Sequence, residues 1–201
     1  MVNYEEVYLD KLAMMESLQN YASPRSKLTR LLQAEELLHI RRGLYIPAHM
    51  TYSLKTLANV IYGPSYISFE FALSHYGYIP ERVVNITSAT YGKNKHKRFD
   101  TPVGSFIYRS VPRAAYHMEM RRIEENGSPY LIATAEKAIC DTLYQYRHIQ
   151  SLKDLAELIF EDLRIDRSAL KEIDPLVVHK LVPLYKKRVL RLFTGMLGRG
   201  L

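Results

Sequence analysis

The sequence of 201 residues has one cysteine, no tryptophan and no long apolar run. Because Cys140 stands alone, the chain can form no internal disulfide and no zinc site built from several thiolates, which fits a reducing compartment. No apolar stretch approaches the roughly 18 residues of a membrane-spanning helix, and the first residues, "MVNYEEVYLDK", are acidic where a secretory leader is basic. We therefore expect a cytoplasmic protein without a membrane partner.

The usual sequence signatures of cofactors and metals are also missing. No glycine-rich loop is present that could cradle the phosphates of a nucleotide. The seven histidines are scattered, and none has the spacing at which it would share a metal ion with Cys140. We therefore predict no cofactor, no metal ion and no catalytic residue, and we do not expect an enzyme.

Positive charge is abundant and unevenly distributed. The formal net charge is +7, and basic residues concentrate in three segments. Residues 23–45 hold five basic and two acidic residues, residues 93–98 hold four basic residues and no acidic one, and no acidic residue follows Asp174. Each cluster alone could be an ordinary solvated surface, but three of them favour a polyanionic partner.

Residues 1–50 predict two helices followed by a β-hairpin. Apolar positions recur every three or four residues over 8–18, as on one face of an amphipathic helix. Pro24 suits the first position of a second helix, with Ser23 as its cap. Two short apolar runs flank Arg41-Arg42-Gly43 and predict strands joined by a tight basic turn. This order of elements is that of a winged helix-turn-helix DNA-binding domain.

Residues 51–201 predict a mixed α+β domain. The chain favours a helix capped by Ser53 and another over 65–76. Four β-rich runs predict a small antiparallel sheet, with a hairpin turn at Asn126-Gly127: these runs are 83–90, 104–111, 115–124 and 129–134. Three C-terminal helices should follow, capped by Thr134, Ser151 and Asp174. The predicted fold class is therefore α+β, a winged helix-turn-helix followed by this mixed domain.

The second predicted helix has a polar face suited to the major groove of DNA. On a helix that turns about 100° per residue, this face lies opposite Leu28, Leu31 and Leu32. Arginine can bind guanine in a bidentate fork, glutamine can do the same for adenine, and hydroxyls, lysines and free helix N–H groups hold phosphates. The predicted DNA-binding residues are Arg25, Ser26, Lys27, Thr29, Arg30 and Gln33, with Arg41 and Arg42 at the hairpin turn.

Four segments of the sequence resemble the AbiEi-type antitoxin and transcriptional regulator family. They are "SPRSKLTRLLQAEELLHIRRGLY", "GPSYISFEFALSHYG", "IPERVVNITSAT" and "ATAEKAICDTLY", which lie between Ser23 and Tyr144. The most specific parts are "GPSYIS" at 63–68 and "AEKAICD" at 135–141. Ala135 occupies a position that commonly holds proline in the family.

The resemblance implies a component of a bacterial type IV toxin–antitoxin system. In that family, an N-terminal winged domain represses its own operon, and a C-terminal domain, here 51–201, counters a toxin that resembles a nucleotidyltransferase. The implied partners are the double-stranded DNA of the operator and the cognate toxin or its nucleic-acid target. The resemblance implies the same DNA-facing residues and assigns no side chains to the antitoxin role.

A second basic patch is predicted in "KNKHKR". Its members are Lys93, Lys95, Lys97 and Arg98. The segment is either a mobile loop between predicted strands, a second phosphate contact or a surface that faces the toxin.

Two alternatives use other residues. A metal-dependent nuclease with a winged targeting domain would use carboxylates of Asp100, Glu119 and Glu136 to hold magnesium, with Lys137 to steady the attack. A glutamate in the first turn of a helix more often complements the helix dipole. Base stacking on single strands would use four tyrosines that are also suited to filling the core: Tyr62, Tyr66, Tyr76 and Tyr78.

Overall fold

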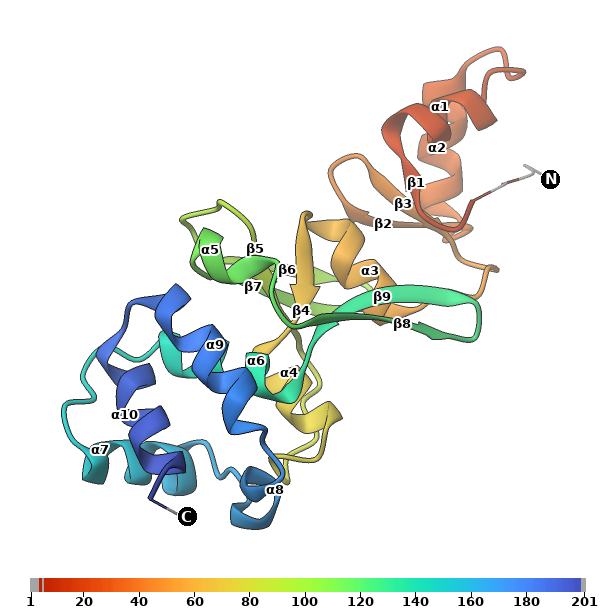
Figure 1. The fold of residues 1–201 in the computed structure, drawn as a ribbon. Helices are drawn as coiled ribbons and strands as arrows, with labels where there is room; N and C mark the ends of the chain where they lie inside the picture. Colours follow the sequence, from red (N-terminus) through yellow and green to blue (C-terminus); the bar gives the residue numbers. More distant parts are fainter. Residues whose placement is uncertain (1–3, 5, 200–201) are drawn as a thin grey trace.

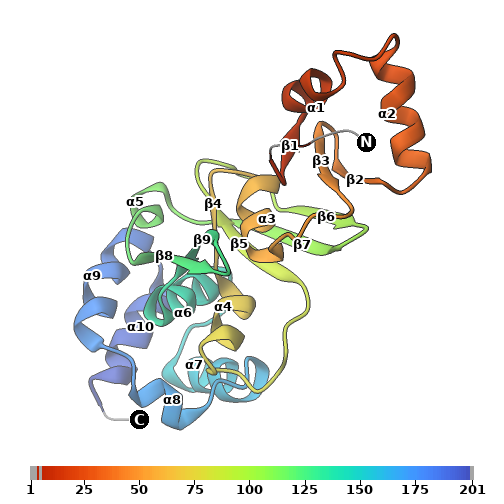
Figure 2. The same ribbon diagram turned by 90° about the vertical axis from the view of Figure 1, so that its right-hand side faces the viewer.

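A computed structural model describes Tyr4 and residues 6–199 and shows a mixed α+β fold (Figure 1). The chain forms two sheets, one with three strands and one with six. The three-stranded sheet and two helices lie at one end of the molecule, and most of the remaining helices gather at the opposite end (Figures 1 and 2). The predicted α+β class is confirmed.

Residues 6–47, the N-terminal unit, contain two helices and an antiparallel sheet with the order β1–β3–β2. The elements are β1 (Leu9–Asp10), α1 (Lys11–Ser17), α2 (Pro24–Gln33), β2 (Leu37–Arg41) and β3 (Leu44–Pro47). The second helix and the hairpin lie where the sequence predicts them. The winged helix-turn-helix interpretation of this unit stays a prediction, as does a domain boundary at residue 50.

The first helix begins later than its apolar pattern predicts. Leu9 belongs to β1 and pairs with Tyr45, and Asp10 caps α1 because its Oδ1 accepts the N–H of Ala13 at 2.9 Å. The helix therefore starts at Lys11 and turns Leu12 outward, with 76% of that side chain exposed. A small core forms from other residues: Leu9, Met14, Leu18, Leu31 and Leu37.

The larger sheet is wider than predicted and has mixed strand directions. Its order is β6–β7–β5–β4–β9–β8, with parallel pairs β5–β7 and β4–β9 and antiparallel pairs elsewhere. Its strands are β4 (Ser65–Ile67), β5 (Ile86–Thr90), β6 (Lys97–Thr101), β7 (Gly104–Ser110), β8 (Met120–Glu125) and β9 (Ser128–Ala133). The sheet of the predicted mixed domain therefore has more strands than expected and two parallel pairs, and within 93–98 the residues Lys97 and Arg98 lie on β6.

Two further differences concern predicted helices. The stretch 65–76 reads as one helix, but Ser65–Ile67 is buried between β5 and β9 as a central strand, and the helix begins only at Phe69. The last predicted helix is divided into two helices, Pro175–Tyr185 and Arg188–Leu197. Between them, Lys186 adopts a left-handed conformation with φ of 51°, which ends the first helix. Both features depend on packing partners that are distant in sequence.

Four of the predicted helix caps are confirmed. Ser53, Thr134, Ser151 and Asp174 each accept a backbone N–H at the start of the expected helix. The helices are α3 (Leu54–Ile61), α4 (Phe69–His75), α5 (Arg113–Tyr116), α6 (Ala135–Tyr144), α7 (Leu152–Glu157), α8 (Arg167–Lys171), α9 (Pro175–Tyr185) and α10 (Arg188–Leu197), with a π-helical turn η1 (Leu158–Asp162) after α7. None of the helices in the described residues is long and apolar enough to cross a membrane.

A fully buried polar network connects three parts of the larger core. The Asp141 carboxylate accepts hydrogen bonds from Tyr66 and Ser68 at 2.8 and 2.7 Å, and from Lys137 Nζ at 2.9 Å. The hydroxyl of Tyr185 donates to the same carboxylate from α9. Burial and the charge of Asp141 raise the pKa of both tyrosines, so their hydroxyls keep the protons that they donate.

A second polar contact joins α3 to the hairpin of β8 and β9. Lys55 Nζ lies 2.8 Å from both carboxylate oxygens of Glu125, and the hydroxyl of Tyr130 donates to the same carboxylate. These hydrogen bonds lower the pKa of Glu125 from its usual 4.5. The ionised form of Glu125 therefore contributes to the stability of the fold.

Replacing Asp141 should destabilise the protein strongly. Asp141→Asn leaves the buried charge of Lys137 without its counter-ion, which costs about 3–5 kcal/mol in the free energy of unfolding. Urea denaturation measures this change. The double variant Lys137→Met/Asp141→Asn, which buries no charge and keeps an acceptor oxygen for the surrounding hydroxyls, should be less destabilised than Asp141→Asn. A loss below about 1 kcal/mol in Asp141→Asn would contradict this assignment, because removal of one partner of a buried pair should cost more.

The Glu125 contact should depend on pH. Because the folded pKa is depressed, its stabilisation is present above the unfolded value of 4.5 and is lost as the pH falls through the folded pKa. The stability difference between the wild type and Glu125→Gln should therefore be largest near neutral pH and shrink in acid, measured by urea denaturation at several pH values. Glu124→Gln, which removes an exposed carboxylate, is the control and should have the smaller effect at neutral pH. A difference between the wild type and Glu125→Gln that stays constant from neutral pH into acid would refute the argument.

Candidate nucleic-acid interface

The polar face of α2 is open to solvent. Figure 2 shows α2 on the side of the N-terminal unit that lies away from the six-stranded sheet. Leu31 on the opposite side of the helix is buried. The exposed side chains of this face are Arg25, Ser26, Thr29, Arg30 and Gln33. The face is therefore available to a large ligand, as its predicted role requires.

The two hydroxyls on this face already have partners. Thr29 Oγ1 donates to the carbonyl oxygen of Arg25 at 3.1 Å, and Ser23 donates to Ser26 Oγ at 2.8 Å. Ser23 thus stands at the N-cap position without donating or accepting a capping hydrogen bond. Within the described residues, Arg25 and Arg30 form no ion pair, so both guanidinium groups can meet an anionic partner.

Lys27 lies on the flank of the helix. Its side chain is half-buried, and its Nζ lies 5.2 Å from the centre of the Tyr21 ring. The charge therefore sits over an aromatic face in the segment that joins α1 to α2. This placement suits a contact with a phosphate at the edge of the surface better than one with a base.

The two arginines of the hairpin turn differ in their surroundings. Arg42 is exposed, whereas Arg41 is half-buried and its Nη1 donates to the carbonyl oxygen of Arg42 at 3.0 Å. Arg41 belongs to β2, which contacts β6 of the larger sheet, and its positive charge opposes the rise that burial causes in the pKa of Tyr108. Arg42 is therefore the better candidate for contact with DNA.

The second basic patch is partly neutralised. Lys97 and Arg98 lie on the edge strand β6, and Arg98 forms an ion pair with Asp100 at 2.9 Å. Lys93 Nζ lies 3.9 Å from the centre of the Tyr62 ring. Lys95 and Lys97 are exposed. The patch offers fewer unpaired cations than its sequence indicates.

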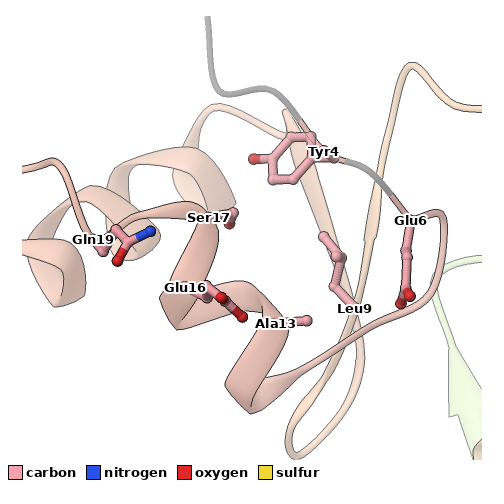
Figure 3. Close-up of a pocket in the computed structure, with 7 residues that line it drawn as sticks. All are labelled: Tyr4, Glu6, Leu9, Ala13, Glu16, Ser17 and Gln19. Carbon is pink, nitrogen blue, oxygen red and sulfur yellow. The ribbon is translucent and has the colours of Figure 1, made fainter.

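A hollow of about 300 Å³ lies beside α1 (Figure 3). Its lining includes the carboxylates of Glu6 and Glu16, on the N-terminal segment and on α1. Negative charge repels phosphates, so this hollow does not extend the basic surface of α2.

The residues of the nuclease alternative lie apart. Asp100 is on the edge strand β6, and Glu119 directly precedes β8 at the opposite edge. Five strand spacings of about 4.8 Å separate these edges by roughly 24 Å. Lys137 is fully buried, and Glu136 accepts the N–H of Asp174 at 3.3 Å. In the described part of the chain, no group of three or more histidine, cysteine, aspartate or glutamate side chains could hold a metal ion.

The tyrosines considered for base stacking are largely inside the fold. Tyr66 and Tyr78 are buried, and the hydroxyl of Tyr76 donates to the carbonyl oxygen of Ala133 at 2.9 Å. Tyr62 is half-buried beneath Lys93. These rings form the core and its edge and are not a platform for bases.

The two most specific motifs of the sequence meet in the core. Tyr66 and Ser68 come from "GPSYIS", and Lys137 and Asp141 come from "AEKAICD". These side chains are fully buried and bonded to one another, so they contribute to the stability of the fold. Their shared role was not recognised from the sequence, although the motifs mark four of its members. Nothing in the sequence around Tyr185 marks the fifth.

The comparisons with known proteins add little to this geometry. No family model matches the sequence, and no curated protein matches it. Among solved structures, the chain is similar to the crystal structure of the RV2827C protein from Mycobacterium tuberculosis, with 14% sequence identity over 90% of this chain and 71% of that chain. The TM-score is 0.45, so this similarity supports no inference about fold or function.

The hairpin arginines should respond differently to substitution. Arg42→Ala removes an exposed cation and should weaken binding to duplex DNA, with a change below about 0.5 kcal/mol in the free energy of unfolding. Arg41→Ala removes a half-buried side chain and should lower stability more than Arg42→Ala does. Gel-shift titration and urea denaturation measure the two effects. Stronger loss of DNA binding in Arg41→Ala than in Arg42→Ala would reverse this assignment.

Proposed function

We propose that this protein is a DNA-binding transcriptional autoregulator and the antitoxin of a bacterial type IV toxin–antitoxin system. In this proposal it acts in the cytoplasm without catalysis. The N-terminal unit is a winged helix-turn-helix that binds the operator of its own operon. The remainder of the chain counters a toxin that resembles a nucleotidyltransferase.

The observation that carries the DNA-binding part is the exposed face of α2. Arg25, Arg30 and Gln33 project from one helix whose opposite side is anchored by Leu31, and the basic hairpin turn follows directly. A helix of this kind fits the major groove, where arginine and glutamine read guanine and adenine. Arg42 would then contact the neighbouring backbone or minor groove.

The antitoxin part is supported by the sequence resemblance to AbiEi-type proteins. Its two most specific motifs lie in the larger core, where they contribute to stability. The residues that would face a toxin have to be sought on the exposed surface around that core. Co-expression with a nucleotidyltransferase-like protein from the adjacent gene tests this part. That protein alone should arrest growth, and co-expression of the present chain should restore it.

Binding to DNA upstream of its own gene should weaken steeply with salt. The four candidate cations other than Arg41 are Arg25, Lys27, Arg30 and Arg42. At about 0.9 for each neutralised phosphate, they predict a slope near −3.6 for log affinity against log salt, per bound copy. Gel shifts over a salt series measure it. A slope near zero would contradict the proposed surface, and magnesium-dependent cleavage of the DNA would favour the nuclease alternative.

Arg30 should contribute to sequence specificity. If it reads a base, Arg30→Ala should weaken binding to the operator by about 1–3 kcal/mol and leave binding to unrelated DNA less affected. Arg122→Ala, on the edge strand β8 of the larger sheet, is the matched control and should leave operator affinity unchanged. Equal weakening on all sequences would make Arg30 a phosphate contact only.

A further inference from the structure

A second hollow, larger than the one beside α1, lies between α3, α4 and the segment that leads into β5. Its volume is about 630 Å³, within the range of small-molecule sites. It is lined in part by Leu54, Lys55, Phe71, His75, Arg82 and Val84. None of these residues belongs to the surface proposed to bind DNA, so the hollow needs its own explanation.

The apolar part of the hollow leaves hydrophobic surface in contact with water. Val84 is 82% exposed and Leu54 is 39% exposed, and Phe71 is half-buried beside them. An apolar body placed against these side chains would remove this surface from water, which is favourable. The hollow therefore fits a ligand with a hydrocarbon portion.

The charged part of the hollow favours an anion. Its one carboxylate, Glu125, is already held by Lys55 and by the hydroxyl of Tyr130. Arg82 is exposed and forms no ion pair within the described residues. Burial and the charge of Lys55 lower the pKa of His75, so this imidazole is neutral at pH 7 and can donate a hydrogen bond. The lining thus has one unpaired cation.

We propose that this hollow binds a small carboxylate with an apolar body. The guanidinium of Arg82 pairs with the carboxylate, for which its planar fork is suited, and the hydrocarbon lies against Phe71 and Val84. A cationic ligand would place its charge near Arg82 and is disfavoured. A neutral ligand would gain the apolar contacts without the ion pair.

The rim of the hollow is bonded to the N-terminal unit. Ser53, which lines the hollow, donates its N–H to the hydroxyl of Tyr8 at 3.0 Å, and that hydroxyl donates to the carbonyl oxygen of Ser53 at 2.9 Å. Tyr8 directly precedes β1. A ligand against Ser53 and Leu54 therefore contacts the backbone that holds the N-terminal unit, and its binding should change operator affinity. This regulatory part rests on the proposed function.

Calorimetry on the full chain with octanoate, octanamide and octylamine tests the site. These probes share one hydrocarbon chain and differ in charge. Octanoate should bind about tenfold more tightly than octanamide, and octylamine should bind most weakly. Arg82→Gln should abolish the preference for octanoate over octanamide. Val84→Ser should weaken the binding of both ligands equally. Arg122→Gln, an exposed arginine outside the hollow, should change nothing.

Three results would overturn the site: no binding of octanoate, equal binding of octanoate and octanamide, or an unchanged preference in Arg82→Gln. Gel shifts with and without octanoate, on the wild type and on Tyr8→Phe, test the regulatory part separately. Octanoate should alter operator affinity in the wild type and less in Tyr8→Phe. If octanoate leaves the operator affinity of the wild type unaltered, the regulatory part is refuted. The calorimetric results on ligand binding then still test the site itself. Absence of operator binding without octanoate refutes the proposed function instead.

Discussion

The carboxylate of Asp141 is the constraint on which the larger fold depends. It lies in an apolar core, where a charge without partners would be prohibitively costly, so the surrounding elements must supply its donors. Lys137 comes from the same helix, Tyr66 from β4 and Tyr185 from α9. The hydrogen bonds to Asp141 therefore hold the central strand β4 and the helices α6 and α9 together. In the six-stranded sheet, β4 then pairs with β5 on one side and with β9 on the other.

The β2–β3 hairpin belongs to both parts of the molecule. Leu37 packs in the small core of the N-terminal unit, whereas Ile40, Leu44 and Ile46 pack in the larger core. This shared hairpin orients the exposed face of α2 relative to the larger sheet. Because the hairpin also packs in the larger core, Arg41 is half-buried. Of the two arginines at the turn, only Arg42 is exposed to a partner.

The candidate surface on α2 could be predicted well because its determinants are local. A proline at the start of a helix and leucines at helical spacing fix which side chains point outward, whatever the rest of the chain does. The hollow beside Arg82 could not be predicted. Lys55, His75 and Arg82 come from separate elements, and no spacing in the sequence indicates that they converge. The burial of Lys137 was also missed, since its helix position alone suits either solvent or core.

The sequence alone determined the caps at Ser53, Thr134, Ser151 and Asp174, the turn at Asn126-Gly127 and the polar face of α2, because each depends on residues within about one helical turn or one tight turn. The tertiary structure decided that Ser65–Ile67 is a strand, that Leu12 faces solvent and that the C-terminal helix is interrupted at Lys186. These outcomes depend on which distant segments pack against each residue. Burial and strand pairing between such segments outweigh the local preferences of the chain.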